Sequence, residues 1–326
     1  MIGAIGLKSL LMGMLVLVGV SLTAPAEAAS AAARQQFADR VAKTHKLDQA
    51  WVRQLLAGAV LKPAVREAYK RPAESKSWAE YRKIFITEKR LKAGRAFMQE
   101  HAETFAEAER RFGVPQAVIG AIIGVETFYG VYTGKYRVLD SLVTLAFQKW
   151  KRQKFFQREL EEFVRLSAEG HVDPMTIKGS YAGAMGLSQF ISSSYRAYAI
   201  DFDGDGKRDL LGSPADAIGS VAAYLSRHGW RKGQPVTERV RIPRRFPEAV
   251  YKRNKKPRYP IGEARSGGLR VLPALDDRAP IMIVNLQGAQ GSERWAVAYN
   301  FYVITRYNHS HLYAMAVHQL SEGLAP

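Results

Sequence analysis

The feature that most restricts the fold of this chain is an almost wholly apolar segment from Val118 to Val125. A helix that is apolar on every side is stable in water only where other elements cover it completely. Pro115 stands where the first turn of such a helix is expected, and Gly130 offers a cap at its end. We therefore expect a buried helix around which the rest of the chain packs.

Apolar spacing and breaker residues divide the remaining chain into further expected elements. Helical patterns cover Ala33 to Arg71, Thr87 to Phe112, Ser141 to Ser167, Gln189 to Tyr198, Pro214 to Arg227 and Ala296 to Leu320. Gly94 weakens the second of these helices, because glycine is a poor helix former. Trp78 to Ile86 is short and rich in aromatic residues, which predicts a loop or a strand-like passage. Repeated prolines and alternating runs between Pro235 and Trp295 predict a small β subdomain.

The N-terminus has the pattern of a cleaved export signal. Lys8 precedes an apolar run from Leu10 to Leu22, and Ala26-Glu27-Ala28 supplies the small residues of a cleavage site. Residues 1–28 are therefore predicted to be a signal peptide that directs the chain to the periplasm. The alternative is an uncleaved membrane anchor, for which the apolar run is short. The chain contains no cysteine, which excludes a lipoprotein anchor, disulfides and thiol chemistry.

The formal net charge of the chain is +18, an excess that favours an anionic polymer as partner. Export argues against nucleic acid, whereas the bacterial cell wall carries free carboxylates on its stem peptides. The excess charge is equally compatible with a basic protein that is simply kept soluble by it, so charge alone does not decide the partner.

Glu126 is the first candidate for chemistry, because it lies at the C-terminal end of the apolar helix next to Val125 and close to Phe128 and Tyr129. Apolar surroundings and the negative end of a helix dipole both favour the protonated form of a carboxyl group, as a general acid requires. On the residues alone, a glutamate in the last turn of a buried helix is more often an ion-pair or backbone partner than a catalyst.

Two further segments carry groups that suit a sugar polymer. The glycine-rich stretch from Gly179 to Phe190 would let a polymer approach the backbone, while Ser180 and Gln189 offer neutral hydrogen bonds. A tightly packed turn between helices is the interpretation that the residues alone favour for this stretch. From Tyr299 to Asn308, aromatic side chains stand beside amides, which is typical both of a sugar-binding groove and of a helix packed on a core.

The segment from Asp201 to Asp209 has the spacing of a calcium loop. Asp201, Asp203 and Asp205 occupy positions one, three and five, Gly206 allows the sharp turn, and Lys207 contributes only its carbonyl at position seven. Position twelve is Gly212 instead of a glutamate, which leaves Asp216 as the nearest carboxylate that could close a longer loop. A structural Ca²⁺ site is predicted, with an ordinary Asp-Gly turn as the alternative.

Taken together, these motifs resemble one family. GVETFYG with the following TGKYRVLDSLVTLAF, SYAGAMGLSQF, the Asp-rich loop, DAIGSVAAYLSRHGW and NFYVITRYNHSHLYAMAV are similar, in this order, to segments of the membrane-bound, B-type lytic murein transglycosylases. The resemblance runs from Trp78 to Leu320 and implies a mainly α fold, with a lysozyme-like helical core, an additional helical domain and a small β subdomain. On this basis we divide the chain into a helical domain (29–113), a catalytic core (114–234), a β subdomain (235–295) and a C-terminal helical segment (296–326).

The resemblance also implies a set of functional residues. The catalytic acid of the family falls on Glu126. The groove contacts that the resemblance implies are Tyr81, Arg152, Ser180, Gln189, Tyr224, Tyr307, Asn308 and Tyr313. The chain has Lys151-Arg152 where the family tends to have two arginines, and lysine cannot copy the fork of a guanidinium group.

The activity implied is cleavage of the β-1,4 bond between N-acetylmuramic acid and N-acetylglucosamine, with a 1,6-anhydromuramoyl end as product. One carboxyl group suffices and no cofactor takes part in catalysis. The alternatives are a hydrolytic muramidase, for which Asp140 or Asp173 would be a second carboxylate, and a non-catalytic peptidoglycan-binding scaffold. Glycan strands are the expected partner of a monomer, beside cell-wall synthesis or division proteins, and nucleic acid is excluded.

Overall fold

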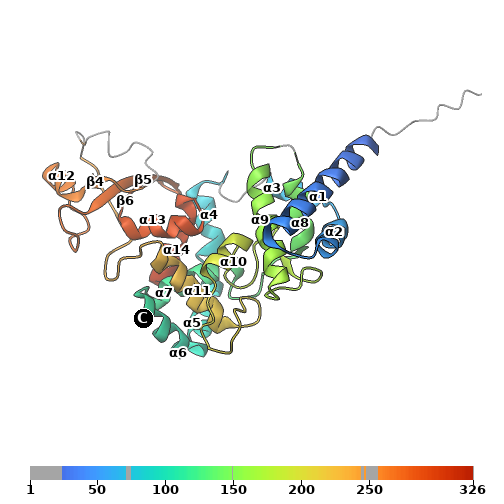
Figure 1. The fold of residues 1–326 in the computed structure, drawn as a ribbon. Coiled ribbons are helices and arrows are strands. Elements are labelled where there is room, and N and C mark those ends of the chain that lie inside the picture. The colour runs from blue at the N-terminus through green and yellow to red at the C-terminus, as the bar shows by residue number, and fades with distance from the viewer. Residues whose placement is uncertain (1–23, 71–74, 149, 244–245, 247–255, 326) are drawn as a thin grey trace, which may run out of the picture.

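The computed structural model describes residues 24–70, 75–148, 150–243, 246 and 256–325 (Figure 1). Most of the predicted signal peptide lies outside these residues. Within the described part of the chain, no helix has both the length and the apolar character needed to cross a membrane.

The described chain is mainly helical, as the sequence predicts. The helices are α1 (Ala24–His45), α2 (Gln49–Ala57), α3 (Pro63–Tyr69), α4 (Trp78–Phe85), α5 (Glu88–Glu100), α6 (Ala102–Phe112), α7 (Gln116–Thr127), α8 (Val138–Ala146), α9 (Gln153–Ala168), α10 (Ser192–Tyr198), α11 (Pro214–Arg227), α12 (Ile261–Ser266), α13 (Tyr299–Tyr307) and α14 (His311–Leu324). The strands are β1 (Tyr136–Arg137), β2 (Lys178–Gly179), β3 (Thr237–Arg239), β4 (Tyr259–Pro260), β5 (Pro280–Gly288) and β6 (Gly291–Val297).

The apolar helix α7 is the buried centre that the sequence predicts, and α5, α6, α11 and α14 pack around it. Ile119, Ile122 and Ile123 have no exposed surface. Two of its glycines let neighbours approach closely. A β-carbon on Gly120 would lie 2.9 Å from the sulfur of Met98, and one on Gly124 would lie 2.4 Å from the hydroxyl oxygen of Tyr129. Neighbouring side chains can thus cover α7 on all sides only because it carries glycine where they approach most closely.

The N-terminal helices α1–α3 lie against α8 and α9 (Figure 1). The link between them is partly polar, because the backbone N–H of Val60 donates to the buried carboxylate of Asp140 at 2.8 Å. The backbone N–H of Lys62 donates to the hydroxyl of Thr144 at 2.9 Å. Buried apolar side chains complete the contact, so these helices share one hydrophobic core with α7.

The four-stranded sheet has the order β3-β6-β5-β4, and its neighbouring strands are antiparallel. β5 and β6 form a hairpin whose last pair is Gly288 with Gly291. A second hydrophobic cluster, which includes Ile261 of α12, Leu269 and Ile281, packs on this sheet separately from the main core. The sheet and α12 lie at the opposite end of the molecule from α1 and α2 (Figure 1). This is the β region predicted from the proline breaks and alternating runs.

Several expectations about local structure are wrong. The helices expected from Ser141 to Ser167 and from Ala296 to Leu320 are each divided in two, into α8 and α9 and into α13 and α14. Trp78 to Ile86 is not a loop or strand but contains α4, which a capping box of Ser77 and Glu80 begins. Its aromatic residues misled the prediction, since Trp78 and Tyr81 lie on one buried face of this helix at a spacing of three.

The helix predicted from Thr87 to Phe112 is interrupted at His101, whose backbone is non-helical, and this lets α5 and α6 pack in different directions. The apolar helix also stops earlier than expected. α7 ends at Thr127, and its cap is the left-handed residue Phe128 rather than Gly130. The end of α7 is held by a contact with a distant segment, the bond from Thr127 to the carbonyl oxygen of Leu187, which local spacing does not record.

Candidate active site

Glu126 occupies the last turn of α7 and is partly exposed, whereas its neighbours Val125 and Thr127 are buried. The chain leaves the helix abruptly, because Phe128 and Tyr129 both adopt left-handed backbone angles, with φ of 53° and 58°. Two successive non-glycine residues in this region are strained and persist only where packing holds them. The turn lifts the following loop away from the helix end and leaves the carboxyl group of Glu126 accessible.

Thr127 fixes this end of the helix to the glycine-rich segment. Its hydroxyl donates to the carbonyl oxygens of Ile123 and Leu187, at 3.1 and 3.2 Å, and accepts from the N–H of Gly130 at 3.0 Å. The acid-bearing helix and the segment from Gly179 to Phe190 are therefore joined directly beside Glu126.

The carboxyl group of Glu126 has a tyrosine as partner. The hydroxyl of Tyr313, at the start of α14, donates to Oε1 of Glu126 at 2.6 Å. The ring of Tyr307 stacks on that of Tyr313 with centroids 6.4 Å apart. Burial, together with the nearby charge of Glu126, raises the pKa of both tyrosines well above its usual value. Both phenols therefore stay protonated at working pH, and Tyr313 remains a donor to the carboxyl group.

Tyr81 lies close to this group, since its charge contributes to the raised pKa of Tyr313. Its ring is buried, with only 1% of its surface exposed, and packs 4.9 Å from that of Phe85. The structure thus brings Tyr81, Glu126 and Tyr313 together from α4, α7 and α14.

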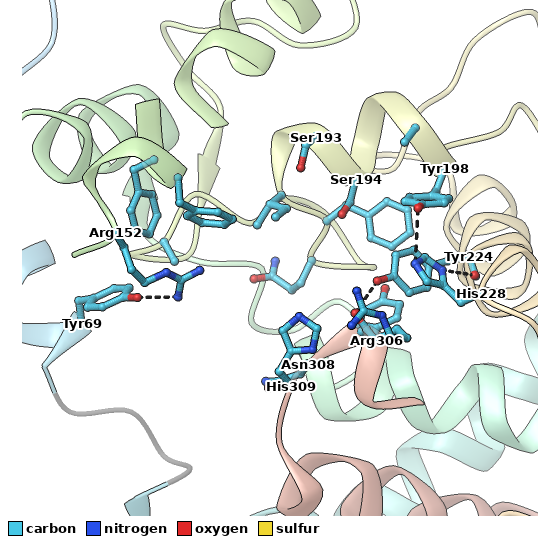
Figure 2. A pocket seen from close by; sticks show the side chains of 18 residues that line it. Tyr69, Arg152, Ser193, Ser194, Tyr198, Tyr224, His228, Arg306, Asn308 and His309 are labelled. Carbon is cyan, nitrogen blue, oxygen red and sulfur yellow. Dashed lines mark hydrogen bonds between the residues drawn. The ribbon is translucent and has the colours of Figure 1, made fainter. Parts of the chain in front are cut away.

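Figure 2 shows a cavity of about 610 Å³ that several of the predicted contacts line. Five of the predicted groove contacts line it, namely Arg152, Gln189, Tyr224, Tyr307 and Asn308. Tyr307 connects the cavity with the acid, because it also stacks on the partner of Glu126. Among the described residues that line the cavity, none carries a carboxylate. The cavity is therefore positively charged and partly aromatic, which suits an uncharged or anionic ligand.

The two tyrosines of the cavity present rings rather than hydroxyl groups to a ligand. Tyr224 donates its hydroxyl to the carbonyl oxygen of Arg306, and Tyr307 donates to that of Ser188, each at 2.5 Å. Their ring centroids lie 4.9 Å apart, and Phe190 packs on both. The hydroxyl groups of both tyrosines are thus bonded within the fold, and the faces of their rings form part of the cavity wall.

Gln189 and Ser180 both lie in the turn that the residues alone predicted. Gln189 has a left-handed backbone, and its side-chain amide donates to the carbonyl oxygens of Gly186 and Thr133, at 2.9 and 3.0 Å. Its amide oxygen is left as an acceptor. The hydroxyl oxygen of Ser180 accepts backbone bonds from Ala182 and Ala184, so its own proton is available to a ligand. Ser180 lies outside the residues that line the cavity.

Arg152 is supported by aromatic side chains at the other end of the cavity from Arg306 (Figure 2). Its guanidinium group donates to the hydroxyl of Tyr69 at 2.7 Å and lies 4.2 Å from the ring centroid of Phe155. Lys151 is exposed and is not part of the cavity lining.

The residues that line the cavity and that the sequence interpretation missed include Tyr69, Tyr198, His228 and Arg306. Tyr224 and His228 are four residues apart, and their rings stack with centroids 4.0 Å apart. That spacing at the end of a predicted helix was a usable signal. For Tyr69, which reaches the cavity from α3, the local sequence gave no such signal.

The two carboxylates considered as partners for a hydrolytic reaction are engaged elsewhere. Asp140 accepts from Val60 and also pairs with Arg137. Asp173 accepts from the backbone of Met175 and the hydroxyl of Thr176, and these bonds lower its pKa. Each has a local structural task within the described chain.

The Asp-rich segment forms a compact loop in which Asp201, Asp203 and Asp205 place carboxylate oxygens within 4.8 Å of one another. Gly204 and Gly206 take the left-handed backbone that the turn requires. Three hard oxygen donors at this spacing fit a cation such as Ca²⁺.

Asp216 does not join this group. It is fully buried in the first turn of α11 and accepts the N–H groups of Phe202 and Asp209, at 2.6 and 2.7 Å. Both its oxygens hold the loop backbone, as those of Asp201 also do, so its role as a metal ligand stays a prediction. Lys207 is exposed, and a contribution from its backbone carbonyl stays a prediction.

Comparison with known proteins gives a consistent family. A family model described as a transglycosylase SLT domain matches residues 29–322. The chain is 37% identical over 306 residues to the membrane-bound lytic murein transglycosylase B of Escherichia coli, a match that covers 89% of this chain and 82% of that protein.

Two solved structures are also similar. The soluble lytic transglycosylase SltB1 from Pseudomonas aeruginosa has a TM-score of 0.83 and 44% identity, covering 89% of this chain and 97% of that one. The lytic transglycosylase Slt35 of Escherichia coli, solved in complex with calcium, has a TM-score of 0.79 and 37% identity, covering 90% of this chain and 92% of that one.

Proposed function

The chain belongs to the transglycosylase SLT domain family, and from this membership we propose how its site cleaves peptidoglycan. It is a peptidoglycan lytic transglycosylase with the mainly α, lysozyme-like fold that the sequence predicted. The observation that carries the mechanism is a single accessible carboxyl group, Glu126, bonded to Tyr313 beside a cavity without carboxylates.

In the proposed first step, protonated Glu126 donates its proton to the glycosidic oxygen between N-acetylmuramic acid and N-acetylglucosamine. The bond from C1 of the muramic residue to that oxygen breaks, its electron pair goes to the oxygen, and N-acetylglucosamine leaves with a free 4-hydroxyl. An oxocarbenium-like centre remains at C1, where the substrate's own acetamido group supplies stabilisation. The phenol of Tyr313 donates to the carboxylate that forms on Glu126.

In the second step, ionised Glu126 takes the proton from the C6 hydroxyl of the muramic residue. The C6 oxygen attacks C1, which closes a 1,6-anhydro ring and returns Glu126 to its protonated state. Water is not consumed, so no second catalytic carboxylate is required, unlike the paired carboxylates of most glycosidases. The engagement of Asp140 and Asp173 elsewhere supports this reaction over the hydrolytic alternative.

The remaining site residues receive roles from their geometry. Gln189, Ser180 and Asn308 offer neutral hydrogen bonds to sugar hydroxyl and acetamido groups, and Arg152 meets a carboxylate or a sugar oxygen. The ring faces of Tyr224 and Tyr307 are proposed to pack on sugar rings, since their hydroxyl groups are engaged. Tyr81 and Tyr313 act by positioning Glu126.

We further propose a structural Ca²⁺ held by Asp201, Asp203, Asp205 and the carbonyl of Lys207, on the chemistry of these donors and the calcium complex of Slt35. The ion would supply charge neutralisation to the loop and takes no part in the reaction.

Export to the periplasm by cleavage after Ala28 is also proposed, and the family match that begins at residue 29 supports it. We also propose domain boundaries after residues 113, 234 and 295. The separate hydrophobic cluster of the β region supports the division. We propose in addition that the protein is a monomer and that it contacts cell-wall synthesis or division proteins.

The deciding experiment digests purified sacculi with the wild-type protein and with Glu126→Gln, and identifies the glycan ends by mass spectrometry. Anhydromuramic ends from the wild type, lost by at least about a thousandfold in Glu126→Gln, are expected because the amide cannot donate the proton. Glu103→Gln, an exposed change of the same kind on α6, should retain full activity. Reducing muramic ends would establish hydrolysis instead, and binding without cleavage by the wild type would establish a scaffold.

A further inference from the structure

Beyond Arg306, which lines the cavity, a row of cations and tyrosines runs along α13. We call the residues Arg231, Lys256, Tyr299, Tyr302 and Arg306 the α13 strip. The guanidinium carbon of Arg231 lies 4.1 Å from the ring centroid of Tyr299, and the ammonium nitrogen of Lys256 lies 5.1 Å from the same centroid. Lys256 also lies 5.4 Å from the ring of Tyr302, over which the guanidinium of Arg306 lies at 6.0 Å.

The fold holds the far end of this strip in place. Asn300, which is fully buried, accepts the N–H of Arg231 at 2.8 Å and donates to the carbonyl oxygens of Arg231 and Gln234, each at 2.9 Å. A β-carbon on Gly229 would lie 3.3 Å from the ring of Tyr299, so the backbone beneath this ring is also close-packed. The backbone of Arg231 is thus fixed to the helix that carries Tyr299.

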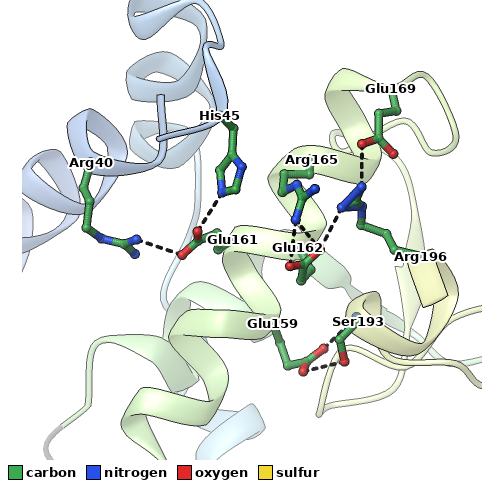
Figure 3. A network of polar contacts seen from close by, with 9 residues as sticks. All are labelled: Arg40, His45, Glu159, Glu161, Glu162, Arg165, Glu169, Ser193 and Arg196. Atoms are coloured by element: carbon green, nitrogen blue, oxygen red, sulfur yellow. Dashed lines mark hydrogen bonds and ion pairs between the residues drawn. The ribbon is translucent and has the colours of Figure 1, made fainter. Parts of the chain in front are cut away.

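The cations of the strip differ in their ion pairing from the cations that form salt bridges within the fold. Figure 3 shows the second kind: Arg165 and Arg196 both reach Glu162, and Arg196 also reaches Glu169. Within the described chain, by contrast, Arg231, Lys256 and Arg306 form no ion pair with a carboxylate. Arg231 and Lys256 are exposed, and the two tyrosines are half-exposed.

Arg306 joins the strip to the cavity. It lines the cavity, its carbonyl oxygen accepts from Tyr224, and its guanidinium group reaches the ring of Tyr302 on the neighbouring turn of α13. A polymer that lies in the cavity and leaves it past Arg306 would therefore meet rings and unpaired positive charges.

We propose that the α13 strip binds the part of the same glycan strand that extends beyond the cavity, through the carboxylates of its stem peptides. This inference rests on the proposed function and extends it to substrate choice: the strip favours long, peptide-bearing strands over short or peptide-free ones. The tyrosine rings pack on sugar or peptide CH groups, and the cations that lie over those rings meet the carboxylates. An anionic lipid surface could attract the same charges, but the strip contains none of the large apolar side chains that are exposed in the described chain and would insert into it.

The test compares wild type with Arg231→Gln/Lys256→Gln, which removes two exposed charges and keeps the backbone bonds of Arg231. The substrates are long soluble glycan strands that carry stem peptides, the same strands after enzymatic removal of the peptides, and tetrasaccharide fragments without peptides. We expect KM for the long peptide-bearing strands to rise about five- to tenfold, with kcat unchanged, since one or two charge-assisted contacts are lost. The change on the other two substrates should stay below about twofold, and the effect should shrink in high salt.

The control Lys43→Gln/Lys92→Gln removes the same charge from exposed positions on α1 and α5 and should leave all three substrates unaffected. An equal rise in KM for both double variants would mean that net charge acts and would overturn the strip. Unchanged KM on long strands would do the same. If the double variant instead loses binding to vesicles of anionic lipid while keeping its preference for long strands, the strip is a membrane contact and the proposal is wrong. Cleavage of the tetrasaccharide by wild type tests the proposed function separately, because those fragments lack the peptides that the strip would bind.

Discussion

Two loops adjoin the core of this protein, and they are held in opposite ways. The turn after Glu126 is held by volume: the ring of Tyr129 fills a slot between α5 and α7, where β-carbons on Gly94 and Gly124 would lie 2.2 and 2.4 Å from its hydroxyl oxygen. The Asp-rich loop is held by charge and hydrogen bonds, since Asp201, Asp203 and Asp205 each accept backbone N–H groups of their own loop. The first should therefore respond to the size of side chains and the second to ions.

The largest effect is expected from Gly124→Ala, which puts a methyl group against the hydroxyl and ring of Tyr129. The free energy of unfolding should fall by about 3 kcal/mol, the upper part of the range for overpacked sites. Urea unfolding measures this change. Gly58→Ala is the matched control, because its β-carbon would meet neighbours only at 3.5 Å or more.

The double variant Gly124→Ala/Tyr129→Leu sharpens the interpretation. If the slot is the cause, shortening residue 129 should recover part of the loss, and the two changes should not be additive. Additive losses would mean that Gly124 matters for another reason, such as the flexibility of α7.

A middle-sized effect is expected when Ca²⁺ is added. At tenfold excess over its Kd, the ion should stabilise the folded chain by about 1.4 kcal/mol, seen as a higher Tm. Asp203→Asn should abolish this shift. Asp48→Asn should retain it, because asparagine caps α2 as well as aspartate does. A shift that survives Asp203→Asn would place the ion elsewhere, and the effect of Gly124→Ala should be the same with and without Ca²⁺.

The smallest effect is expected from Tyr129→Phe. The hydroxyl group of Tyr129 is buried and has no hydrogen-bond partner among the described residues, and burial raises its pKa. Its removal should leave the free energy of unfolding unchanged or raise it by up to about 1 kcal/mol. Tyr195→Phe is the contrast on the side of the Asp-rich loop, since that hydroxyl donates to the carbonyl of Arg208 and accepts from the N–H of Leu210. It should destabilise by about 1 to 2 kcal/mol, and equal effects of the two changes would contradict the comparison.

The same contrast explains how far the sequence could be interpreted. The Asp-rich loop could be located because its ligands are neighbours in the chain, so spacing alone identifies Asp201, Asp203 and Asp205. The buried helix α7 was recognisable from its composition. The other contacts that hold each loop in place could not be predicted from the sequence. Asp216 was also assigned to the metal; its oxygens hold the loop backbone, and spacing did not predict those bonds.

Around Glu126 the deciding contacts are distant in sequence. The left-handed turn at Phe128 and Tyr129 contains no glycine and gives no local signal; it exists because Gly94 on α5 leaves room for a ring. On local patterns alone, Gly94 counts as a weak point in a helix, whereas the fold uses it as a contact surface for Tyr129. For α4, aromatic residues favoured a strand, but the buried face of Trp78 and Tyr81 and the cap at Ser77 make a helix.

The hydrogen bond between Glu126 and Tyr313 joins residues 187 positions apart. A chain still being synthesised carries α7 long before it carries α14, so the acid is made well before its partner. Loop closure over such a separation is slow, and contacts of this kind form late in folding. An incomplete or newly emerging chain therefore holds Glu126 without the phenol that positions it. Assembly of the catalytic centre thus requires that the chain has been made and folded as far as α14.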